Sequence, residues 1–290
     1  MSKLTKLIHQ CKRVITLPDS VEVLRTRSRE SDEQLARISN LIGGIEWQLN
    51  RLDSATLPPT PHTSDLRFYG QFGPPVDCFI FDRYFPDTNI RGTCVESGAF
   101  DGVTESSCKF FEETMGWQSY NIEPMPNAYE RLVANRPNSK NYNFAFSDQC
   151  GKATFKQVSH PELGLHFGNS SLSHTELHLK DLLDRGCQIS EFEVPTMTWR
   201  EWVAQERIPF VDLLILDVEG HELQVIEGMV GSPVMPDILC IEIGHLSFES
   251  IRQALCGLGY IYDVTSHVNA YFIRADRLSL FALRAAQRRH

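Results

Sequence analysis

A short stretch of the sequence combines a carboxylate with two glycines at the end of a strand-like segment. The residues VESGAFDGVTES place Glu96 just before Gly98, Ala99 and Gly102. Glycines let the backbone turn tightly and approach a ligand, and a helix predicted to begin near residues 101–104 would offer free N–H groups to an anionic group. A carboxylate at this point would repel a pyrophosphate but attract an ammonium group. The stretch therefore predicts a loop for a cofactor that carries a positive charge.

A second carboxylate, Glu123, ends the next predicted strand. An acidic residue at that place in a nucleotide-binding fold accepts hydrogen bonds from a ribose diol. S-adenosylmethionine has an α-ammonium group, a carboxylate and a ribose. These three features match the two acidic residues and the glycine loop, so S-adenosylmethionine is the predicted cofactor.

Further polar residues follow the later predicted strands. Because ligands in an open α/β sheet bind at the carboxyl ends of the strands, we expect one rim to contain Ser147, Asp148, Asp217, Glu219, His221, Glu242 and His245.

Methyl transfer from a sulfonium needs alignment of the acceptor and a base that removes its proton. His221 is the candidate base because imidazole titrates near neutral pH; alternatively, it makes a structural hydrogen bond. Asp217 and Glu219 are predicted to position the acceptor, to orient His221, or to bind a divalent ion with Glu242.

We predict no metal site from the histidines of the sequence. His174 and His178 are spaced as i and i+4, but the HExxH pattern and a cysteine pair are both absent. We therefore expect these two histidines to lie on a solvated flap or helix.

Strand-like and helical patterns alternate along the chain after residue 64, which favours a parallel sheet with crossover helices. Two apolar runs, VDLLILD and DILCIEI, lack alternation, as strands buried on both faces do. The last two strands are too close in sequence for a crossover helix and should form an antiparallel hairpin. The predicted strands are 93–97, 118–123, 141–146, 211–217, 237–243, 259–264 and 270–274.

The pattern predicts three segments: a helical appendage (1–53), a Pro-rich linker (54–64) and one α/β domain (65–290) with an insertion at about 159–192. The appendage contains a narrow heptad stripe that favours a partner helix and predicts a homo-oligomer. The stripe consists of Leu35, Ile38, Ile42, Ile45, Leu49 and Leu52.

Composition narrows the class of protein. The 290 residues carry a net charge of −9, which weighs against nucleic acid as the main partner. No stretch approaches 18 uninterrupted apolar residues and no signal-peptide pattern is present, so we expect no membrane span and a cytoplasmic location. The eight cysteines are scattered without a CxxC pair, which suits a reducing compartment.

The motifs YGQ, VESGAFDGVTES, GWQSYNIEPMPNAYERL, NFAFSD and LLILDVEGHELQVIEGM occur in this order over residues 69–244. In this order they resemble the FkbM-type family of S-adenosylmethionine-dependent methyltransferases. The resemblance implies a Rossmann-like class I methyltransferase fold, with a seven-stranded, mostly parallel sheet and a terminal antiparallel strand. It also implies O-methylation of a sugar, glycan or natural-product hydroxyl.

The resemblance assigns roles by matching position. Glu96, Gly98 and Gly102 would hold the methionine end of the cofactor, and Glu123 the ribose. Asp148 would contact the adenine edge. The family commonly has Asn at position 101, where this chain has Asp. We expect Asp101 to face away as a helix cap.

The sequence leaves two other functions open. An NAD-dependent oxidoreductase shares the fold class and the acid after the second strand. A non-catalytic scaffold protein would keep the cofactor pocket without turnover and bind its partners through the heptad helix. The acceptor cannot be named, because its pocket would come from the insertion and the N-terminal helices.

Overall fold

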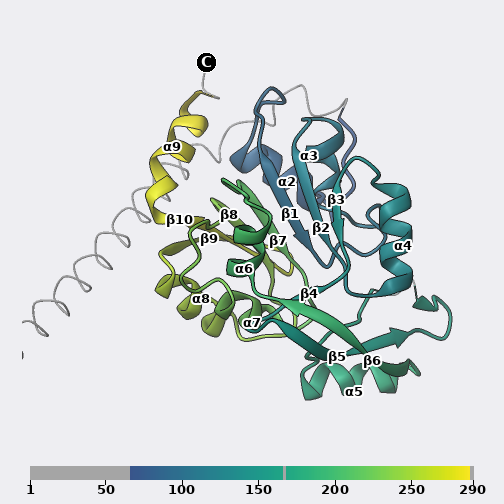
Figure 1. Cartoon of the computed structure of the whole chain (residues 1–290). Coiled ribbons are helices and arrows are strands. Elements are labelled where there is room, and N and C mark those ends of the chain that lie inside the picture. Colours follow the sequence, from purple (N-terminus) through teal and green to yellow (C-terminus); the bar gives the residue numbers. More distant parts are fainter. Residues whose placement is uncertain (1–65, 166–167, 288–290) are drawn as a thin grey trace, which may run out of the picture.

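The computed structural model describes residues 66–165 and 168–287, and over these residues the chain forms three layers, with helices on both sides of a central sheet (Figure 1). The predicted appendage (1–53) and linker (54–64) lie outside the described residues. The heptad helix and the domain boundary at residue 65 therefore stay predictions.

The central sheet has seven strands in the order β3-β2-β1-β7-β8-β10-β9. All neighbouring strands are parallel except for the pairs that involve β10. This topology confirms the predicted fold class. The strands are β1 (Thr93–Ser97), β2 (Gln118–Ile122), β3 (Lys140–Tyr142), β7 (Leu213–Leu216), β8 (Ile238–Glu242), β9 (Tyr260–Ser266) and β10 (Asn269–Arg274).

The β7 strand shows why the apolar runs do not alternate. Leu214 and Leu216 pack into one buried cluster, whereas Leu213 and Ile215 pack into a second cluster on the other face of the sheet. Successive side chains of a strand point to opposite faces, so a strand covered on both sides needs apolar residues throughout.

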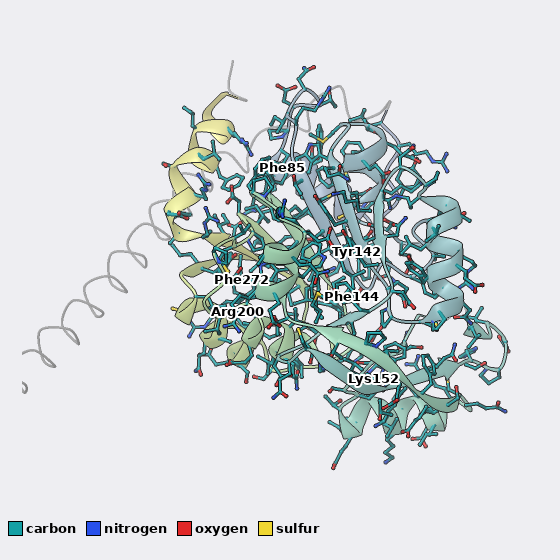
Figure 2. All side chains as sticks on the ribbon, in the orientation of Figure 1. Phe85, Tyr142, Phe144, Lys152, Arg200 and Phe272 are labelled. Atoms are coloured by element: carbon teal, nitrogen blue, oxygen red, sulfur yellow. The ribbon has the colours of Figure 1, made fainter. Side chains whose placement is uncertain are left out.

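Helices cover these two clusters from opposite sides of the sheet (Figure 1). Figure 2 labels Phe85, which belongs to one cluster, and Phe144 and Phe272, which belong to the other. The helices are α2 (Val76–Tyr84), α3 (Lys109–Glu113), α4 (Pro126–Asn135), α5 (Glu176–Asp184), α6 (Trp199–Gln205), α7 (Glu222–Glu227), α8 (Phe248–Gly257) and α9 (Leu278–Gln287), with the 3₁₀ turn η3 (Ala275–Arg277) before α9.

The predicted hairpin at the end of the chain is confirmed. Strand β10 pairs antiparallel with β9 and inserts between β9 and β8. The connection is a tight turn at His267, which has a φ of 53°. A short connection can only join antiparallel neighbours, which is why the loop length alone was enough to predict this feature.

The strand predicted over residues 141–146 is wrong as a single element. The chain pairs with β2 as far as Tyr142 and then leaves the central sheet, because the side-chain amide of Asn143 donates to the carbonyls of Glu123 and Pro124 at 2.8 and 3.0 Å. Beyond Asn143 the chain enters a second sheet, in the order β4-β6-β5. The strands of this sheet are β4 (Ala145–Phe146), β5 (Gly151–Ser159) and β6 (Gln188–Met197).

Strands β5 and β6 of this second sheet lie at the two ends of the predicted insertion. Strands β5 and β6 pair antiparallel along their length, and α5 lies beside them at one end of the molecule (Figure 1). Lys152, labelled in Figure 2, lies on β5. The insertion is therefore built on a sheet of its own, which the sequence prediction did not include.

The predicted helix start near residues 101–104 is also wrong, because α3 begins at Lys109. Asp101 accepts hydrogen bonds from the backbone N–H groups of Val103 and Thr104 at 2.9 and 2.7 Å. Side-chain acceptors that take backbone N–H groups favour turns over helix. Asp101 therefore caps a turn and not a helix.

The side chain of Thr198 caps the start of α6. The Thr198 hydroxyl accepts from the backbone N–H of Glu201 at 3.1 Å and donates to its carboxylate at 2.9 Å. Ser247 stands at the corresponding position before α8, but its side chain makes no capping hydrogen bond.

Candidate functional site

A cavity of about 470 Å³ lies at the carboxyl ends of β1, β2, β7 and β8. In the sheet order, β1 stands beside β7, and the chain runs outward from these two strands in opposite directions. This is the switch point at which α/β sheets bind ligands. The cavity is lined by seven of the ten predicted site residues: Glu96, Gly98, Ala99, Glu123, Asp217, Glu219 and His221.

The remaining three predicted residues do not line the cavity. Gly102 packs under α4, where an added Cβ would meet side-chain atoms of Leu132 and Arg136 at 2.6 and 2.7 Å. Ser147 is buried and Asp148 is exposed, and the Ser147 hydroxyl donates to the Asp148 carboxylate at 3.0 Å. The adenine contact assigned to Asp148 therefore stays an untested prediction.

Gly98 brings the ends of β1 and β7 together. Its φ is 90°, a conformation that side chains with a Cβ rarely adopt, and a Cβ there would lie 1.8 Å from the backbone oxygen of Asp217. Only glycine permits this approach. The turn after β1 thus forms one wall of the cavity directly against the end of β7.

Glu96 lines the cavity, but both of its carboxylate oxygens are engaged within the protein. One oxygen accepts from the backbone N–H groups of Ser107 and Cys108 at 2.6 and 3.3 Å, and the other accepts from the Ser106 hydroxyl at 2.7 Å. Burial raises the pKa of Glu96, and the nearby guanidinium of Arg136 opposes this rise. Glu96 thereby fixes the loop between β1 and α3.

Arg136 is a site residue that the sequence reasoning missed. Its side chain is buried, and its guanidinium pairs with Glu112 and lies 4.0 Å from Glu96. It also donates to the carbonyl of Gly102 and the hydroxyl of Ser106, both at 3.1 Å. A lone arginine near the end of α4 carries no sequence signal for this role.

Glu123 stands where the prediction placed it, at the end of β2. Its two carboxylate oxygens accept from the backbone N–H groups of Phe100 and Met125 at 2.9 and 2.8 Å. Burial raises the pKa of Glu123 to about 7, while these hydrogen bonds and Arg131 favour the ionised form. The carboxylate is held in one orientation against the cavity, with lone pairs left to accept further hydrogen bonds.

His221 is buried between two hydroxyl groups. Nε2 lies 3.0 Å from the hydroxyl of Ser147, and Nδ1 lies 2.9 Å from the hydroxyl of Ser173. A neutral imidazole satisfies both contacts, because one ring nitrogen donates and the other accepts. Burial lowers the pKa of His221 to about 4. The contacts match a structural role for this residue more closely than a role as a base.

The turn after β7 is shaped by Glu222, the last residue of the DVEGHE motif. Its Oε1 accepts from the backbone N–H groups of Val218 and Gly220, both at 3.2 Å. Glu219 between them has a φ of 57°. The turn therefore holds Asp217 and Glu219 at the cavity wall.

Three carboxylates meet at the ends of β7 and β8. One oxygen each of Asp217, Glu219 and Glu242 lies within 4.8 Å of the others, and Asp217 has the most exposed side chain of the three. Burial together with the charges of Asp217 and Glu219 raises the pKa of Glu242 to about 10. Like charges at this separation therefore disfavour ionisation of all three acids at once.

The insertion contributes its own wall to the cavity, including Leu163 and residues 168–172. The expectation that its histidines are solvated is wrong for His178, which is 6% exposed. Its ring stacks on His245 with centroids 3.6 Å apart. No pattern in the sequence indicated that α5 would pack against the loop after β8.

Within the described residues, no helix combines the length and the apolar character that a membrane crossing requires.

Comparison with known proteins gives one family. The family model of the Methyltransferase FkbM domain matches residues 96–262, which is more than half of the chain. No curated protein matches the chain.

Several solved structures resemble the chain at low identity. A methyltransferase FkbM from Methylobacillus flagellatus KT is 14% identical with a TM-score of 0.39, and the match covers 66% of this chain and 46% of that one. This chain thus spans about half the length of that protein. A TehB-like SAM-dependent methyltransferase from Corynebacterium glutamicum is 8% identical with a TM-score of 0.33, and the match covers 63% of this chain and 80% of that one. A ribosomal protein L11 methylase from Lactobacillus delbrueckii is 10% identical with a TM-score of 0.35, and the match covers 69% of this chain and 76% of that one.

Proposed function

Because the chain belongs to the family of FkbM-domain methyltransferases, we propose that it transfers a methyl group from S-adenosylmethionine to a hydroxyl group of a sugar, glycan or natural-product small molecule. The family supports methyl transfer over the hydride chemistry of an NAD-dependent oxidoreductase. The hydroxyl acceptor and the assignment of individual residues are parts of the proposal.

One observation carries the proposal: a single cavity has a fixed carboxylate at the end of β2 and an accessible carboxylate at the end of β7. Glu123 is held by two backbone N–H groups. Asp217 lines the same cavity, and its backbone packs against the turn at Gly98. The first carboxylate suits a ribose diol. The second would face the hydroxyl group of the acceptor.

The residues of the cavity fit S-adenosylmethionine by the chemistry of their groups. Glu123 would accept hydrogen bonds from the ribose hydroxyls, and Gly98 and Ala99 would leave room for the methionine end. Glu96 would add negative charge near the ammonium group. The apolar side chains of Met125 and Phe155 line the same cavity and would pack against adenine. When bound, the cofactor supplies an activated methyl group.

The residues beyond the cofactor would orient the acceptor and take its proton. Asp217 is our candidate for the proton acceptor, because it is the most exposed of the three clustered carboxylates and lines the cavity. His221, the base predicted from sequence, has both ring nitrogens engaged by serine hydroxyls. We therefore assign His221 to holding the insertion beside the cavity.

The acceptor class can be tested with S-adenosylmethionine labelled in the methyl group. Fractionated cell extract and a panel of monosaccharides, glycans and polyhydroxylated natural products would serve as acceptors. Label in a hydroxyl-bearing product supports the proposal, and label only on amines or proteins contradicts it. Cofactor binding without transfer to any acceptor would instead favour the non-catalytic scaffold.

Replacing Glu123 by alanine should weaken S-adenosylmethionine binding by about 1–3 kcal/mol, the usual cost of losing hydrogen bonds to a charged group. Isothermal titration calorimetry measures this change. Glu130→Ala is the matched control, because Glu130 is exposed on α4. Equal affinity of a folded Glu123→Ala variant and the wild type would remove the ribose assignment.

The same pair of proteins tests the elevated pKa of Glu123, which is about 7. The ionised form is the better acceptor for ribose hydroxyls, and protonation grows as the pH falls through 7. The cation that faces Glu123 is Arg131, which favours ionisation. The affinity difference between wild type and Glu123→Ala should therefore be larger at pH 8 than at pH 6. A constant difference would argue against titration of this carboxyl.

We also propose that the chain forms homo-oligomers through its N-terminal helices, on the strength of the heptad stripe at 35–52. Sedimentation should show a dimer or larger species, and the double variant Ile42→Asp with Leu49→Asp should be monomeric, because charges disrupt an apolar seam. Glu46→Gln in the same predicted helix is the control. A monomeric wild type at micromolar concentrations would contradict this proposal.

A further inference from the structure

Three parts of the chain that are distant in sequence bring metal-ligand side chains together beside the cavity. His178 comes from α5, Glu219 from the turn after β7, and His245 from the loop after β8. One possible ligand atom of each residue lies within 4.8 Å of the other two. Nε2 of His245 is 2.8 Å from a carboxylate oxygen of Glu219.

An independent observation at His178 points to a ligand. The residue is 6% exposed, and its Nε2 lies 3.2 Å from the side-chain oxygen of Asn169. Its Nδ1 is buried and has no hydrogen-bond partner among the residues that the structure describes. Buried polar atoms are almost always paired, and leaving one unpaired costs free energy. An ion bound at this His/Glu cluster would supply the partner that Nδ1 of His178 needs.

We propose that His178, Glu219 and His245 bind a divalent first-row transition metal ion. Two imidazoles and one carboxylate form a ligand set that zinc accepts, with a fourth position left for water or another ligand. Bonds to zinc are about 2.0–2.2 Å long. The ligand atoms lie within 4.8 Å of one another, and rotation of the stacked His178 and His245 rings would bring both lone pairs onto one ion.

A cation would relieve the repulsion between the acids around the cluster. Glu219 also belongs to the group of three carboxylates with Asp217 and Glu242. An ion at His178, Glu219 and His245 would lie beside all three acids. The two histidines distinguish this site from a magnesium site. Zinc binds imidazole nitrogen well, whereas magnesium prefers oxygen ligands.

Two of the ligands, Glu219 and His245, also line the cavity. A metal ion there would face an acceptor bound in the cavity and could hold one of its hydroxyl groups. This consequence rests on the proposed function. Metal binding itself does not, so a chain without methyltransferase activity can still bind the ion.

The test uses the untagged full-length chain after treatment with a chelator. Isothermal titration calorimetry with ZnSO₄ should give one ion per chain, and MgCl₂ under the same conditions should bind at least a hundredfold more weakly. His178→Gln and His245→Gln should each lower the zinc affinity at least tenfold. His267→Gln is the matched control, since His267 is exposed on the β9–β10 turn.

A second readout separates this site from cysteine ligation, because the chain has eight cysteines. Co²⁺ bound to nitrogen and oxygen ligands should give visible d–d absorption without the strong near-ultraviolet band of a cobalt–thiolate bond. Circular dichroism checks that each variant is folded. Absence of stoichiometric zinc binding, a thiolate band, or unchanged affinity in both folded histidine variants would overturn the proposal.

Discussion

Replacing Asp217 by asparagine should lower methyltransferase turnover about a hundred- to ten-thousandfold, the usual loss when a general base is removed. Asparagine keeps the shape of the side chain but cannot take a proton from an acceptor hydroxyl. Asp217 lines the cavity and is the most exposed of the three clustered carboxylates. Single-turnover measurements with labelled S-adenosylmethionine would give the rate.

The affinity for S-adenosylmethionine should change little in Asp217→Asn, because the proposed ribose contact is made by Glu123 across the cavity. Asp184→Asn is the matched control, since Asp184 is exposed at the end of α5. His221→Gln provides the comparison between the two candidate bases. If His221→Gln abolishes turnover and Asp217→Asn does not, the base is His221 and our assignment is wrong.

Replacing Arg136 by methionine should destabilise the fold by about 3–5 kcal/mol, as expected when one partner of a buried ion pair is removed. The side chain of Arg136 is 1% exposed and faces Glu112 and Glu96. Methionine would leave these carboxylates without their cation and would free the carbonyl of Gly102 and the hydroxyl of Ser106. Urea unfolding measures the change.

An exposed ion pair on α5 provides the control for Arg136. Arg185 pairs with Asp181 at 2.8 Å, and both side chains are more than half exposed. Arg185→Met should change the free energy of unfolding by less than about 0.5 kcal/mol, because water screens such pairs. Equal effects of Arg136→Met and Arg185→Met would show that Arg136 does not hold the loop after β1.

The sequence alone determined the features that depend on local pattern. Apolar residues at every position of LLIL predicted a strand covered on both faces, and Leu213 and Leu214 indeed pack on opposite sides of the sheet. The short connection between the last two strands required an antiparallel pair. Because parallel strands share one carboxyl edge, the strand pattern by itself was enough to place Glu96, Glu123 and Asp217 at one rim.

Local competition between hydrogen-bond acceptors decided where some elements begin and end. Asn143 binds two carbonyls of the β2–α4 connection and so divides the strand predicted over residues 141–146. Asp101 and Glu96 take backbone N–H groups that a helix would otherwise use, so α3 begins only at Lys109. These outcomes depend on which acceptor comes close enough in three dimensions, and a linear pattern does not specify that distance.

Contacts between distant segments were decided only by the tertiary structure. His178 and His245 are 67 positions apart in the sequence, and nothing near either residue marks it as a neighbour of the other. Arg136 joins α4 to the loop after β1 in the same way. The periodicity of apolar residues and the capping residues act over a few positions. They therefore determine the strands, the turns and the residues at the carboxyl edge of the sheet. The partner of a buried polar side chain is set by how whole elements pack, and this determined the charge network beneath the loop and the histidine cluster beside the cavity.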